Sequence, residues 1–188
     1  MTVSYLAGRY YAAAPAGARF KSAPLQSGLL LATPFTLTEN LELTAIELVS
    51  TSLSVQQGVV KVALYSAING VPSGAPVLTV DVRIPQVGRA LWQVPTDGDG
   101  NPIPVALLAG SYFVVTMTVG NLTLRAIDGS TQEIESVFGR SDLSDPRPVS
   151  ALTLPGAAVT ALPLTFTGTE SWQDWHGPAA APAVYLAS

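Results

Sequence analysis

Apolar and polar residues alternate along much of this chain, which is the pattern of strands with one buried face. The clearest case is the stretch 59–78, VVKVALYSAINGVPSGAPVL, in which residues 60, 62 and 64 are apolar and share one face. Residues 69–76 follow with Asn, Gly and Pro, which favour the backbone angles of a turn. We therefore predict a strand, a projecting turn and a second strand here.

Similar alternation predicts other strands, and turn-forming residues separate most of them. A helix over 39–49 competes with a strand over 41–53, but β-branched residues favour the strand. Pro34 favours an edge or a bulge in its segment. The last strand is expected to pair beside the first and close the sheet. The segments with strand character are 29–35, 41–53, 77–84, 111–127 read as a hairpin, 162–168 and 183–187.

Two stretches lack a clear alternation. Residues 1–28 are rich in Ala, Pro and Gly and are predicted to be an extended N-terminal arm, which carries Tyr5, Tyr10 and Tyr11. The arm either lies across a neighbouring subunit, as an assembly contact, or packs on its own domain. Residues 128–156 are predicted to be a long surface excursion with an acidic face and one short helical turn near 133–138.

Together these segments predict a single all-β domain over residues 29–188, preceded by the arm. About seven or eight short strands at close spacing are typical of sandwiches and jelly rolls. We therefore predict an antiparallel β-sandwich of jelly-roll type.

The composition of the chain limits the classes of partner that it can bind. The net charge is −4 and only 12% of the 188 residues are charged, so no basic surface is available for nucleic acid or an anionic membrane. No apolar run reaches the roughly 18 residues of a membrane span. The fraction of charged residues is low and 48% of the residues are hydrophobic, which indicates that other subunits cover part of the surface. We expect a homo-oligomer, with a trimer favoured.

Catalytic and metal-binding chemistry has few candidates in this sequence. The chain has no cysteine and one histidine, His176, and it lacks a G-x-S-x-G nucleophile motif. The segment DGDGN at 97–101 matches only the first half of a calcium loop, because Pro102 and Leu108 stand where a glycine and a carboxylate are needed. A hairpin turn explains these residues better. We predict a protein without enzymatic activity, metal or cofactor.

Aromatic residues near the C-terminus are the remaining candidates for binding. Aromatic rings stack on the apolar faces of sugars, and they equally fill cores and subunit interfaces. Packing is the favoured interpretation, with glycan or partner contact as the functional alternative. The candidate contact residues are Trp172, Trp175, His176 and Tyr185.

Residues 9–127 resemble a segment that recurs in structural proteins of tailed bacteriophages. There a strand of the form V-x-x-x-L-Y leads into N-G-x-P-x-G and then V-L, and an "L-x-x-G-x-Y-W" element follows. The matching residues are Tyr10-Tyr11, Thr33-Pro34-Phe35, Ile46, Val60, Leu64, Tyr65, Asn69, Gly70, Pro72, Gly74, Val77, Leu78, Leu107 to Phe113, and Leu124-Arg125-Ala126. Phe113 departs from the usual aromatic of its element. In these phage proteins a long fibre segment often precedes the module, whereas here the matching residues begin at Tyr10, so we expect a small virion protein rather than a full fibre.

The resemblance implies a β-sandwich on a phage particle. The expected function is a tail-tip or tail-fibre component that contacts the host surface, with other virion proteins as partners and a host glycan as a further one. A capsid decoration or head-spike protein is the alternative within this class. A carbohydrate-binding module of a cell-surface protein is the alternative of another class, and a glycan hydrolase has least support. The implied location is the virion, assembled in the bacterial cytoplasm.

Overall fold

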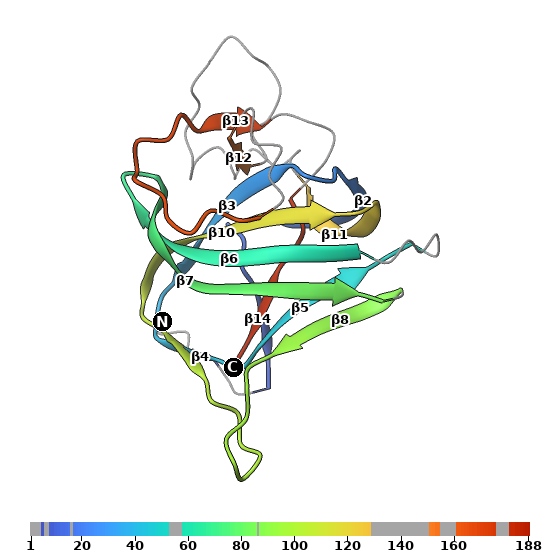
Figure 1. Ribbon diagram of the computed structural model, residues 1–188, viewed down its shortest axis with the longest axis vertical. Helices are drawn as coiled ribbons and strands as arrows, with labels where there is room; N and C mark the ends of the chain where they lie inside the picture. Colours follow the sequence, from blue (N-terminus) through green and yellow to red (C-terminus); the bar gives the residue numbers. More distant parts are fainter. Residues whose placement is uncertain are drawn as a thin grey trace.

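The computed structural model describes residues 5, 8–15, 17–52, 58–85, 87–128, 151–154, 161–175 and 181–188. These residues form strands, turns and loops, and they contain no helix of the length and hydropathy needed to cross a membrane. The fold is all-β, and the strands pair antiparallel in two six-stranded sheets and one short two-stranded sheet (Figure 1).

The strands are divided between the sheets as follows. Sheet 1 contains β1 (Tyr10–Ala12), β2 (Arg19–Leu25), β5 (Ala45–Ser50), β8 (Gly88–Gln93), β11 (Leu122–Asp128) and β14 (Tyr185–Ala187). Sheet 2 contains β3 (Leu30–Leu37), β6 (Gly58–Ile68), β7 (Val71–Ile84), β10 (Gly110–Val119), β12 (Ala151–Thr153) and β13 (Gln173–Trp175). The short sheet pairs β4 (Leu41–Leu43) with β9 (Val105–Leu107).

One hydrophobic core joins the two large sheets. Alternate residues of β5, β11 and β14 in sheet 1 meet alternate residues of β6, β7 and β10 in sheet 2. The residues at its centre include Ile46, Leu48, Leu124, Leu186, Val60, Val62, Leu64, Val80, Val82 and Val114. The alternation predicted at residues 60–64 is thus confirmed, and burial of these side chains is the main force that holds the sheets together.

The opposite face of sheet 2 is buried as well. A cover segment, residues 161–175, packs Phe166 and Trp172 against Tyr65 and Phe113, which point away from the central core. The rings of Tyr65 and Phe166 lie 4.7 Å apart between centroids, and Phe166 lies edge-on to Trp172 at 5.2 Å. Sheet 2 therefore has apolar residues on both faces.

The N-terminal segment differs from the predicted arm. Residues 10–12 form β1, which pairs with β14, and residues 19–25 form β2, which pairs with β11. Composition suggested no strand here because the segment is rich in Ala, Pro and Gly, yet Pro24 lies in β2. β2 is an edge strand of sheet 1, where the missing N–H of a proline is tolerated. The described part of 1–28 thus belongs to the sheet of its own chain.

The turn at 69–76 is shorter than expected. Only Asn69 and Gly70 connect β6 to β7, with φ angles of 53° and 78°, as in a two-residue hairpin turn. Pro72 and Gly74 are already in β7, and the register shifts opposite Leu64 and Ser66. A bulge therefore absorbs the residues that composition assigned to the loop.

The predicted hairpin over 111–127 is wrong, because β10 belongs to sheet 2 and β11 to sheet 1. The chain crosses between the sheets at Gly120, whose φ is 99°. Residues 41–50 form two strands, β4 and β5, rather than a helix. The last strand, β14, lies between β1 and β5 in sheet 1, so it does not pair with the predicted first strand at 29–35, which is β3 of sheet 2. The helical turn expected at 133–138, and most of the excursion 128–156, lie outside the described residues.

Candidate functional site

The outer face of sheet 1 bears the most distinctive group of polar and aromatic side chains in the described chain. Ile46 and Leu48 of β5 point into the core, so Glu47 between them points outward. The same alternation directs Arg89 of β8 outward, because Ala90 is in the core. Across β14 and β1, Tyr185 and Tyr10 occupy outward positions of the same face.

Glu47 and Arg89 form an ion pair on this face. The guanidinium donates through Nε and Nη2 to Oε2 of Glu47, with the Nε contact at 2.5 Å. The Glu47 side chain is only 9% exposed, whereas that of Arg89 is 62% exposed. The hydrogen bond to Glu47 holds the pKa of Arg89 above its ordinary value. The carboxylate is thus largely removed from water and depends on Arg89 for its charge partner.

Arg89 also positions an aromatic ring. Its Cζ lies 5.0 Å from the centroid of the Tyr10 ring, within the range of a cation–π contact. Tyr10 is nevertheless 40% exposed. The chain Glu47–Arg89–Tyr10 therefore presents an anchored but accessible aromatic ring.

A second arginine–aromatic group lies on the same sheet. Arg125 of β11 lies over Phe20 at 5.2 Å and over Tyr185 at 5.8 Å. Burial raises the pKa of Tyr185, and its hydroxyl has no hydrogen-bond partner among the described residues. Tyr185 therefore serves mainly as a packed ring beside Arg125.

A groove of about 530 Å³ borders Tyr10. Its lining includes the small side chains of Ala45 and Ala187 and the polar side chains of Gln93 and Thr96. Thr96 belongs to the loop between β8 and β9, which projects from the sheets (Figure 1). The groove offers an aromatic ring, an amide and a hydroxyl, which suit an uncharged polar ligand or a partner's loop.

The tip of that loop contains the residues considered for calcium. Asp97 Oδ1 accepts hydrogen bonds from the backbone N–H groups of Asn101 at 2.8 Å and Asp99 at 3.0 Å. These hydrogen bonds hold the pKa of Asp97 below its ordinary value, and the bond from the backbone of Asn101 contributes most. The carboxylate thus closes a turn. In the described part of the chain, no three His, Cys, Asp or Glu residues are grouped as metal ligands.

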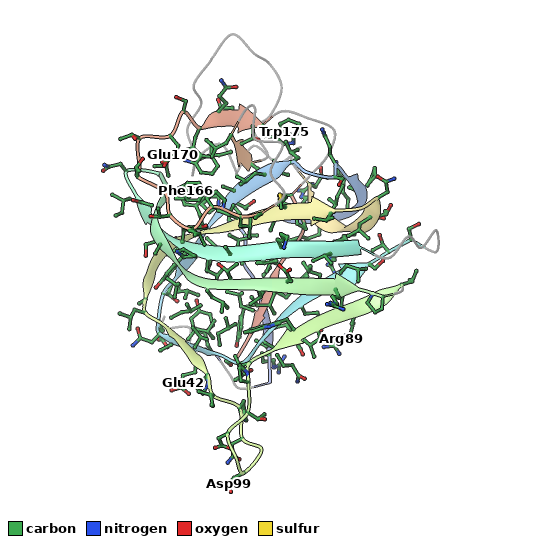
Figure 2. The ribbon with its side chains drawn as sticks, in the orientation of Figure 1. Glu42, Arg89, Asp99, Phe166, Glu170 and Trp175 are labelled. Carbon is green, nitrogen blue, oxygen red and sulfur yellow. The ribbon has the colours of Figure 1, made fainter. Side chains whose placement is uncertain are left out.

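The aromatic residues predicted from sequence are not gathered at one site. Trp172 is part of the cover segment and packs against Phe166, and its indole Nε1 is buried without a hydrogen-bond partner among the described residues. Trp175 packs near Leu31 and Ala151, whereas Tyr185 is on the other sheet. Figure 2 shows Arg89 well apart from Phe166 and Trp175. His176 lies outside the described residues.

The three N-terminal tyrosines contact their own domain. Tyr5 and Tyr11 meet edge-on with centroids 4.8 Å apart, and Tyr5 Oη accepts a hydrogen bond from the backbone N–H of Thr38 at 3.3 Å. Tyr10 alone lies on the outer face of sheet 1. Glu47, Arg89 and Arg125 were not among the binding residues proposed from sequence, although their outward position follows from the alternation of their strands.

No protein-family model matches this chain, and no curated protein matches it significantly. The surface described above and the local resemblance in residues 9–127 are the grounds for a functional assignment.

Proposed function

We propose that this chain is a non-enzymatic structural component of a bacteriophage virion, in the tail tip or tail fibre, where it contacts the host surface. Its partners are other virion proteins, further copies of itself and a host surface glycan. The resemblance in residues 9–127 supports the virion assignment. The single structural observation in its favour is the outer face of sheet 1, with its accessible Tyr10.

That face has the composition of a binding surface. Aromatic residues and arginine are enriched in protein interfaces, and a ring held in place loses little entropy on binding. Arg89 holds Tyr10 from one side, and the adjacent groove of about 530 Å³ gives a partner a concave surface. These features suit recognition of a partner or ligand at this face.

The proposal includes a jelly-roll type of sandwich. Its support is the way successive strands alternate between sheets: β5 is in sheet 1, β6 and β7 in sheet 2, and β8 again in sheet 1. Crossings of this kind are typical of jelly rolls, in which few neighbouring strands form hairpins.

Two other functions remain as alternatives. A capsid decoration or head-spike protein uses the same face for attachment to the capsid. A carbohydrate-binding module of a cell-surface protein is favoured by the groove itself, because Tyr10 and Gln93 combine a ring with an amide.

Immunogold labelling of phage particles with an antibody against this chain distinguishes the tail component, the capsid decoration and the carbohydrate-binding module. Label at the tail tip supports the main proposal, label over the capsid supports the decoration alternative, and label confined to the surface of uninfected cells supports the carbohydrate-binding module.

Tyr10→Ala is expected to reduce adsorption of particles to cells. The matched control is Ile68→Ala, which removes a side chain of similar exposure at the far β6–β7 turn. Equal adsorption by both variants would remove the sheet 1 face from the proposal.

A further inference from the structure

The edge of sheet 2 at β7 is open. β7 is 14 residues long and is the terminal strand of its sheet, with β6 as its strand partner (Figure 1). Among the described residues, the one backbone pairing of β7 beyond β6 is the bridge of Gly74 to Phe166. The outward backbone groups of residues 77–84 therefore have no strand partner among the described residues, and they can pair with another strand.

The open part of β7 carries one charge of each sign. Val80, Val82 and Ile84 point into the core, so Asp81 and Arg83 lie on the outer face, where both are exposed. Asp81 makes an ion pair with Lys61 of β6 at 2.9 Å. The guanidinium of Arg83 has no carboxylate partner in the part of the chain that the structure describes.

The surface beside these residues is hollowed. A depression of about 410 Å³ is lined by Gly58, Val59, Asp81, Arg83, Ile84 and Pro85. It lies at the end of β7 that carries the unpaired arginine. When another strand pairs with β7 and extends the sheet, the outward side chains of that strand have room in this depression.

This arrangement is complementary to itself. When two copies of β7 pair antiparallel about Val82, Asp81 of each copy lies opposite the partner's Arg83. Two ion pairs then form, and each Arg83 gains a carboxylate that it lacks among the described residues of its own chain. Val80 also comes opposite the partner's Ile84, so apolar residues continue on the inner face.

Neighbouring registers are unfavourable. When the register shifts by one residue, the inward side chains of one copy lie opposite outward side chains of the other copy. The apolar residues of the two strands then no longer share a face. A pair centred on Asp81 brings two aspartates together, and a pair centred on Arg83 brings two arginines together. Like charges directly opposite one another destabilise a strand pair. The charges therefore select the register about Val82.

We propose that β7 is a self-association edge, which pairs with β7 of a second copy about a two-fold axis at Val82. The contact is isologous, so it produces dimers rather than the trimer expected from sequence. The contact is short, and its affinity is accordingly modest. The proposal holds wherever the chain acts and does not depend on the virion assignment.

Sedimentation velocity over a concentration series tests the contact. The wild-type chain is expected to dimerise reversibly. Asp81→Arg alone and Arg83→Asp alone each replace two attractive pairs with two repulsive ones, so each raises the dimer dissociation constant roughly tenfold or more. An equimolar mixture of these two variants is expected to form a heterodimer, because each then opposes the other's charge. The double variant with both changes regains self-association.

Lys61→Ala is the matched control, since it removes the ion pair of Asp81 within the chain and leaves the edge charges in place. It is expected to dimerise like the wild type. A wild-type chain that stays monomeric throughout the series overturns the proposal and assigns the charges to protection of the edge. A dimer or trimer that neither single variant weakens overturns it equally. Heterodimer formation in the mixture shows that both variants fold.

Discussion

The hydroxyl of Tyr65 provides a sharp test of how the cover segment is held. Tyr65 lies in β6 with no exposed surface, and its Oη donates a hydrogen bond to the carbonyl oxygen of Pro163 in the cover segment. Tyr65→Phe removes that donor and leaves the carbonyl without it. A lost hydrogen bond of this kind costs about 1 kcal/mol. In a chain of 188 residues we expect the thermal midpoint at pH 7 to fall by about 2–4 °C.

The same residue makes stability depend on alkaline pH. Burial raises the pKa of Tyr65 to about 12, against about 10 in the unfolded chain. The stabilisation from keeping this hydroxyl neutral is complete below pH 10 and is lost as the pH rises through 12, because the unfolded chain releases the proton first. The wild type should therefore lose about 1.4 kcal/mol per pH unit between these values through this group.

Urea unfolding of the wild type and of Tyr65→Phe, at several pH values from 7 to 12, measures both effects. The other tyrosines are present in both proteins, so their contributions cancel in the difference. The variant is expected to be less stable at pH 7 and to lose less stability between pH 10 and 12. Parallel stability curves over that interval would show that the Tyr65 hydroxyl is not buried as described.

Three further substitutions test other parts of the structure. Phe166→Ala is expected to cost about 3–5 kcal/mol in urea unfolding, since it empties the contact between the cover segment and sheet 2; a loss under 1 kcal/mol contradicts that packing. Gly70→Ala should cost about 1–2 kcal/mol because its φ is +78°, whereas Gly98→Ala, equally free of contacts but without a positive φ, should cost less; equal losses refute the turn. Arg89→Ala should lower the thermal midpoint more than Leu91→Ala, because Glu47 stays buried without its cation.

The sequence predicted strands better than it predicted their partners. Alternation at residues 60–64 and 111–119 correctly located β6 and β10, because each side chain's burial depends on its own strand. The same reasoning assigned residues 111–127 to a hairpin, and there it failed. Whether two successive strands pair or cross to another sheet depends on contacts with distant residues, such as Ser27 beside Thr118.

The candidate site shows the same division. Tyr10 was considered from sequence as part of an arm, and Tyr185 as part of an aromatic group with Trp172. Only the pairing of β1, β14, β5 and β8 places Tyr10 near Arg89 and Glu47. No local pattern relates these residues, because they are far apart along the chain.

The sequence by itself determined that this chain is all-β, that most of its strands have apolar inner faces, and that Asn69-Gly70 reverses the chain. These properties follow from residue types and the two-residue period of a strand. The tertiary structure decided which sheet each strand joins, that the N-terminal segment is part of sheet 1, and that Trp172 packs with the cover segment against sheet 2. Those outcomes depend on long-range pairing and burial, in which each strand competes for the same core.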